Sequence, residues 1–203
     1  IGDSAFDTCE ELNGTLTLNE GLLTIGDDAF AACVKFIGDL TIPNSVTSIG
    51  DSAFDECESL DGTLTLGSGL LTIGDDVFND CFSLTGNLVI PDNVTSIDEG
   101  AFYRLSSMTG TLTIGSGITR IEDVTFKYGG FTGSLVIPTN VTHIGEEVFE
   151  DCRWLTGNLV LHAGITHVGY QAFEETFLLT SCDCYIAKTA FSGNGQFRAS
   201  GIS

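Results

Sequence analysis

The chain has 203 residues, of which 28 are acidic and 7 are Lys or Arg, so its formal net charge is −21. The acidic residues are concentrated up to residue 103, which makes nucleic acid and anionic membranes poor partners for the N-terminal half, and we expect no nucleic-acid partner. No apolar run approaches the roughly 20 residues of a membrane-spanning helix, so we expect no direct membrane insertion.

A phenylalanine recurs along the chain every 24 residues, with one interval of 23 residues. The series is Phe6, Phe30, Phe54, Phe78, Phe102, Phe126, Phe149 and Phe173. An Ile or Val stands five residues before each member, and Gly, Ala, Cys and Leu positions recur in the same register. Self-similarity at this period predicts a solenoid in which each coil contacts only its neighbours.

Each repeat contains three predicted elements, which follow one another in chain order. In the first copies, alternating residues predict a strand around Thr15 to Leu18 and a second short strand around Leu22 to Ile25. A brief helical turn is expected at residues 28–33. Stacking would place a parallel sheet on one face and short helical turns on the other, in about eight coils.

A longer period of two copies is superimposed on the repeat. Pro43, Pro91 and Pro138 mark every second copy, and an intervening copy reads Gly-Ser-Gly at residues 67–69. The order Ile-Pro, Val-Thr-x-Ile-Gly and Ala-Phe-x-x-Cys, which residues 42–57 follow closely, resembles the BspA-type leucine-rich repeats. The resemblance implies a β-rich α/β solenoid whose sheet binds proteins or glycans.

The repeat pattern divides the chain into two parts. Residues 1–180 form the predicted solenoid, which starts in mid-repeat without an N-terminal cap and is expected to be a piece of a longer protein. Residues 181–203 are predicted to be a C-terminal cap or tail. Cys182 and Cys184 lie in this tail, and the sequence does not decide whether they form a disulfide in an oxidising compartment.

Two other columns suggest structural roles. Five cysteines share the position three residues after the core phenylalanine, and we interpret them as buried free thiols because no Cys-x-x-Cys pair is present. Acidic pairs such as Asp27-Asp28 and Asp75-Asp76 precede the expected helical turns and would cap them. Calcium between coils is the alternative, but no calcium-loop motif supports it, so we predict no metal and no cofactor.

Two columns beside the inward leucines of the first strand must face outward by alternation. We predict that they form the binding face, which comprises Thr15, Thr17, Thr41, Thr63, Thr65, Asn87, Val89, Thr111, Thr113, Val136, Asn158 and Val160. The alternative is that β-branched residues stand there only for strand propensity. Thr-x-Thr pairs are also typical of ice-binding solenoids, but here they occur only in alternate copies.

A C-terminal patch is the second predicted contact site. Arg120, His143 and His167 align in one column and would form a basic, titratable stripe. Arg153 and the single tryptophan, Trp154, stand at surface positions and are predicted to be a contact hot spot. The alternatives are that the stripe replaces exposed Ser and Thr without consequence, and that Trp154 packs on the cap.

The function predicted from these patterns is a noncatalytic protein- or glycan-binding adhesion module, extracellular or at the cell surface. None of the three histidines lies in a catalytic or metal-binding motif, so no enzyme is expected. Asn13, Asn93 and Asn140 begin glycosylation sequons. The alternative function is a structural subunit, whose partners would be neighbouring subunits in a larger assembly.

Overall fold

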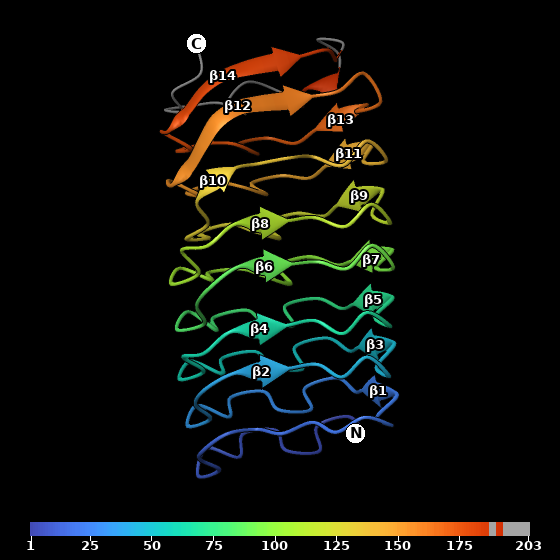
Figure 1. Ribbon diagram of the computed structural model, residues 1–203, viewed down its shortest axis with the longest axis vertical. Helices are drawn as coiled ribbons and strands as arrows, with labels where there is room; N and C mark the ends of the chain where they lie inside the picture. Colours follow the sequence, from blue (N-terminus) through green and yellow to red (C-terminus); the bar gives the residue numbers. More distant parts are fainter. Residues whose placement is uncertain (187–189, 193–203) are drawn as a thin grey trace.

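The computed structural model describes residues 1–186 and 190–192, which wind into a solenoid of about seven turns. Its coils stack along the longest axis of the molecule, from the N-terminal coil at the bottom of the view to the C-terminal coil at the top (Figure 1). The predicted leucine-rich repeat solenoid with parallel strands is therefore confirmed.

The second predicted strand of each repeat forms one column, which we call the odd-strand column. It consists of β1 (Thr24–Ile25), β3 (Ser48–Ile49), β5 (Thr72–Ile73), β7 (Ser96–Ile97), β9 (Arg120–Ile121), β11 (His143–Ile144) and β13 (His167–Val168). The first four pair in parallel as one sheet, and the last three pair as another. In every strand the second residue is buried, because successive side chains of a strand point to opposite faces.

The first predicted strand of each repeat forms the even-strand column. It consists of β2 (Leu40–Thr41), β4 (Leu64–Thr65), β6 (Leu88–Val89), β8 (Leu112–Thr113), β10 (Gly133–Ser134), β12 (Leu155–Leu161) and β14 (Leu179–Cys184). These strands pair in parallel as β2-β4, β6-β8 and β10-β12-β14. In the first copy only Gly14 makes a β-bridge, with Phe36, so the strand expected around Thr15 is not formed.

The predicted helical turns are wrong, since the segments opposite the strands are turns and no α-helix occurs in residues 1–186 or 190–192. Two residues in each of these turns take positive φ, as Asp28 does at 52° and Ala32 at 53°. This conformation directs backbone N–H groups along the solenoid axis: Phe30 N donates to Ala53 O at 2.8 Å. A helix would bond within its own coil, so bonding between coils replaces it.

A ladder of phenylalanine rings runs through the core. Rings of successive coils stack with centroids 5.1–5.7 Å apart, and those of Phe54, Phe78 and Phe102 are fully buried. No single coil could bury these rings alone, so the stack makes each coil depend on its neighbours.

The cysteines of the repeat form a second ladder beside the rings. The thiols of Cys57 and Cys81 donate to the phenylalanine carbonyl of the preceding coil at 3.2 and 3.1 Å. Burial raises the pKa of Cys33 to about 11 and that of Cys152 to about 12, so both stay protonated at neutral pH. The prediction of buried free thiols is confirmed for four of the five cysteines, while Cys9 is half-buried.

The two-copy period has a packing cause. A Cβ atom on Gly67 would lie 2.3 Å from the carbonyl oxygen of Pro43, and one on Gly115 would lie 2.3 Å from that of Pro91. Only glycine permits this approach. Pro43 and Pro91 are therefore followed by a glycine corner in the next coil, whereas Pro138 is followed by His162, whose Nε2 lies 3.0 Å from Pro138 O.

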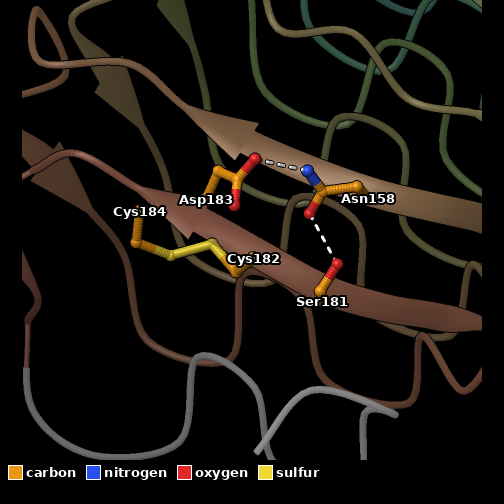
Figure 2. The surroundings of a disulfide bond; sticks show 5 residues. All are labelled: Asn158, Ser181, Cys182, Asp183 and Cys184. Atoms are coloured by element: carbon orange, nitrogen blue, oxygen red, sulfur yellow. Dashed lines mark hydrogen bonds between the residues drawn. A yellow bond between two sulfur atoms is a disulfide. The ribbon is translucent and has the colours of Figure 1, made fainter.

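The parallel pairing continues past the predicted boundary at residue 180. Strand β14 pairs with β12 as far as Cys184. Cys182 and Cys184 form a disulfide on one side of β14, and Ser181 and Asp183 both bond Asn158 of β12 (Figure 2). Most of the predicted cap, residues 187–189 and 193–203, lies outside the described residues, so the cap stays a prediction.

Candidate functional site

The even-strand face is the surface formed by the twelve predicted binding residues, and all twelve side chains are exposed. Their outward orientation follows from strand alternation, as the sequence predicts. Only one charged residue, Asp39, stands in these two columns between residues 15 and 160. Val89, Val136 and Val160 add exposed apolar surface, at 53%, 71% and 43%. The face therefore contrasts with the acidic remainder of the chain.

Some polar groups of this face are already used between coils. Asp39 Oδ1 accepts hydrogen bonds from the backbone N and Oγ1 of Thr63, at 2.7 and 2.9 Å. Asn87 Oδ1 accepts the same pair from Thr111, at 2.8 and 3.2 Å. These contacts order the face but interrupt the regular rank of threonine hydroxyls that an ice-binding surface would need.

The acidic column has a structural role in the described coils. Asp27 Oδ1 accepts a hydrogen bond from Asp51 N, and Asp51 Oδ1 accepts one from Asp75 N, each at 3.0 Å. A Cβ atom on Gly50 or Gly74 would lie 2.1 or 2.3 Å from these oxygens, so both positions are glycine. The carboxylates cap backbone N–H groups of the next coil rather than the N-terminus of a helix.

An open groove of about 390 Å³ runs along this acidic column, lined by Asp3, Asp27, Asp51 and Asp98 and by residues of β1, β3 and β5. Within residues 1–186 and 190–192, no group of three or more His, Cys, Asp or Glu side chains is placed to hold a metal ion. The groove therefore gives the calcium alternative no support.

The predicted C-terminal patch is divided between two places. Arg120, His143 and His167 align in register on β9, β11 and β13, as predicted. Arg153 and Trp154 stand just before β12, which begins on the opposite side of the view in Figure 1. The structure therefore does not bring the two groups together.

The histidine stripe is partly neutralised by its surroundings. The imidazole rings of His143 and His167 stack with centroids 4.2 Å apart, and Arg120 Nε donates to Glu122 at 2.8 Å. Burial, followed by the charges of Arg120 and His167, lowers the pKa of His143. Its positive charge therefore develops only in more acidic solution than that of an exposed histidine.

Arg153 and Trp154 border a notch in the surface, which we define by its lining residues. The notch has a volume of about 250 Å³ and is lined by Ser106, Tyr128, Gly129, Gly130, Asp151, Arg153 and Trp154. It lies at the short repeat: one residue lies between Gly129 and Phe131, whereas two lie between Cys81 and Leu84. A missing residue and two glycines thus leave the space that side chains fill in other coils.

Sequence reasoning identified Arg153 and Trp154 but missed Ser106, Gly129, Gly130 and Asp151. The signal that could have found them is the single 23-residue interval, from Phe126 to Phe149, together with the adjacent glycines. A shortened coil in a regular stack must disturb the surface where the residue is lost.

All three sequon asparagines are exposed. The side-chain amide nitrogens of Asn93 and Asn140 donate to the carbonyl oxygens of Ser68 and Ser116, at 2.8 and 2.7 Å. That of Asn13 donates to Glu11 O at 3.1 Å. Their glycosylation stays a prediction. In the described part of the chain, no helix is long and apolar enough to cross a membrane.

The stacked short strands, exposed columns and repeated corners define a β-solenoid of the leucine-rich repeat class. The chain belongs to the BspA type leucine-rich repeat family, which it matches in 6 copies over residues 1–109 and 72–200. The family resemblance noted in the sequence is therefore confirmed. No curated protein matches the chain.

Solved structures of bacterial leucine-rich repeat proteins have a similar fold. A protein from T. pallidum has a TM-score of 0.67 and 28% identity, over 76% of this chain and 70% of its own. A protein from Bacteroides ovatus has a TM-score of 0.58 and 21% identity, over 89% of this chain and 63% of its own. A leucine-rich cell surface protein from Faecalibacterium prausnitzii has a TM-score of 0.53 and 22% identity, over 84% of this chain and 62% of its own. The chain thus spans less than two thirds of the last two proteins, and these two likenesses concern the fold alone.

Proposed function

We propose that the chain is a noncatalytic binding module of the cell surface that holds a protein or glycan ligand against its even-strand face. The observation that carries the proposal is the nearly uncharged, fully exposed face on a chain of net charge −21. Charged residues are depleted from the centres of protein interfaces, and extended solenoid surfaces suit extended ligands. Three exposed valines add the apolar area that such contacts bury.

Two observations support a location outside the cytosol. The disulfide between Cys182 and Cys184 is of a kind that persists in oxidising compartments. The similar protein from Faecalibacterium prausnitzii is named a cell surface protein. Extracellular or cell-surface exposure is accordingly part of the proposal.

The test is binding to arrays of purified extracellular proteins and of glycans, with variants on two faces. Thr65→Arg combined with Thr113→Arg places two charges on the even-strand face and should weaken each positive interaction at least tenfold. Thr72→Arg is the matched control, because Arg120 occupies the same column naturally and Thr72 lies on the odd strands. Binding that survives the double variant but is lost with Thr72→Arg would overturn the proposed face.

The molar mass in solution distinguishes this proposal from the alternative, a structural subunit of a larger assembly. A binding module should be a monomer by light scattering at micromolar concentration. A defined oligomer whose formation is blocked by the double variant would favour the structural subunit.

A further inference from the structure

The notch at the short repeat has a floor that cannot be filled by side chains without distortion. A Cβ atom on Gly130 would lie 2.2 Å from Ser106 O, and one on Gly129 would lie 2.3 Å from Cε2 of Phe131. Contacts this close are not tolerated in packed proteins. Loss of one residue has therefore fixed an open depression at this point of the coil stack.

Aromatic rings border this depression. Trp154 is 59% exposed and Tyr128 is 37% exposed. Tyr103 contacts the Tyr128 ring edge-to-face with centroids 5.5 Å apart, and Lys127 Nζ lies 5.1 Å from the centre of that ring. Tyr128 is thus held in place from its own coil and from the preceding one. An exposed, supported aromatic surface is suited to a ligand with an apolar face.

The charged groups of the lining compensate each other. Arg153 Nε donates to Asp151 Oδ1 at 2.6 Å, and its Nη2 donates to Glu175 Oε2 at 2.8 Å. The guanidinium carbon lies 5.6 Å from the ring centre of Phe177, which further fixes the side chain. Among the lining residues there is one carboxylate and one guanidinium, so the lining has no net charge. A neutral ligand with both donors and acceptors complements it better than an ion does.

Size limits the ligand to one ring. Pockets that bury drug-sized molecules measure about 300–1,000 Å³, whereas the notch measures about 250 Å³. An open notch of this size admits a single ring-sized group whose continuation lies on the surface.

We infer that the notch binds one pyranose ring of an uncharged glycan, with the C–H face of the sugar against Trp154 and its hydroxyl groups bonded to Asp151, Arg153 and Ser106. The inference rests on the proposed binding function and adds to it a ligand class and a place separate from the even-strand face. A pyranose combines an apolar face with a rim of donors and acceptors, which is the combination that the lining offers.

The experiment uses Trp154 as its own probe, because it is the single tryptophan of the chain. The purified protein is titrated with the methyl glycosides of glucose, galactose, mannose and N-acetylglucosamine, and tryptophan fluorescence is recorded. A saturable change in intensity or emission maximum is expected for at least one glycoside at millimolar concentration.

A variant and a matched control assign the signal to the notch. Ser106→Glu fills the notch with a residue that its own column already holds at Glu58, and it should weaken glycoside binding at least tenfold. Glu58→Ser makes the reverse change two coils away and should leave binding unchanged. Circular dichroism establishes that both variants are folded.

The remaining outcomes separate this inference from the proposed function. If no glycoside changes the fluorescence, or if the change persists in Ser106→Glu, the notch is not a sugar site. A response to Nα-acetyl-lysine amide in place of the sugars would also overturn it, by indicating a basic peptide group. Array binding that depends on Thr65 and Thr113 would still support the proposed function in either case.

Discussion

The coils before residue 103 and those after it follow the same fold but differ in what their surfaces hold. The first part contains 19 acidic residues and a single basic one, Lys35, while the second contains 9 acidic and 6 basic residues. In the first part, glycine, aspartate and phenylalanine recur because each contacts its equivalent in the next coil. In the second, exposed columns change to Arg, His and Trp, and one coil is shortened. Residues that contact the next coil are therefore kept the same from repeat to repeat. Exposed positions without such contacts can change to residues that bind a ligand.

The largest expected effect comes from breaking the regular part at its ring ladder. Phe78 is fully buried and stacks on rings 5.6 and 5.5 Å away, so Phe78→Ala removes contacts to two neighbouring coils. The free energy of unfolding should fall by about 3–5 kcal/mol, measured by urea denaturation. Val89→Ala, at a 53% exposed position, is the control and should change little. A loss below about 1 kcal/mol for Phe78→Ala would contradict the ladder's role.

A glycine contacting the acidic column should give the next largest effect. In Gly74→Ala the new Cβ would lie 2.3 Å from Asp51 Oδ1 and 2.8 Å from Asp51 N. We expect a loss of about 1–3 kcal/mol from this overpacking. Gly2→Ala is the matched control, because nothing lies within 4 Å of a Cβ atom at the same position of the first copy. Equal stability of the two variants would show that the close approach relaxes freely.

A carboxyl group in the turns of the first part should make the stability of the protein depend on pH. Burial, followed by the charges of Glu56 and Asp76, raises the pKa of Asp55 to about 6. The folded protein then binds this proton more tightly than the unfolded chain does, so stability falls as pH rises from the ordinary pKa of 3.8 through about 6. After allowance for solvent screening, Asp55→Asn should gain about 1 kcal/mol at pH 7 and much less near pH 4.

Urea denaturation at the two pH values measures this gain. Asp39→Asn is the control: hydrogen bonds from the backbone and the side chain of Thr63 lower the pKa of Asp39, so this variant should show no gain. A gain at pH 4 equal to that at pH 7 would contradict the assignment to ionisation.

The smallest effect is expected in the histidine stripe of the later coils. Because the pKa of His143 is lowered, its protonation opposes folding, and stability falls as pH decreases through the ordinary value of 6.5. His143→Ser introduces a serine, the residue that Ser48 and Ser96 already provide in the same column. It should reduce the loss of stability between pH 7 and pH 5 by a few tenths of a kcal/mol. Thermal unfolding measures the difference, with Thr72→Ser as the non-titrating control. If His143→Ser loses as much stability between pH 7 and pH 5 as the unchanged protein does, the assignment of this loss to His143 is contradicted.

The sequence was sufficient to predict the columns because both periods, two within a strand and 24 between coils, are written in one chain. The outward positions of Thr65 and Val89 and the alignment of His143 with His167 followed directly. The helical turns failed for a physical reason. Acidic residues before Ala-Phe are typical of a helix N-terminus, but the N–H of Phe30 bonds Ala53 O, 23 residues away. A local window cannot contain that partner.

The candidate sites were predictable in part for a related reason. Arg120 and Trp154 are both late in the chain, but their positions within the coil place them on different sides of the solenoid (Figure 1). The notch needs three successive coils at once, since its lining includes Ser106, Gly130 and Trp154. Sequence shows the missing residue but not the neighbours that enclose the space it leaves.

The alternation of proline and glycine corners from Pro43 to Pro138 limits how this part of the protein can change in length. Inserting a single coil would set two proline corners or two glycine corners against each other, and the contact of Gly67 with Pro43 O has no equivalent in either arrangement. Inserting two coils, or 48 residues, restores every junction. Natural lengthening and engineered extension should therefore proceed in even steps, with the pair of coils as the smallest exchangeable part.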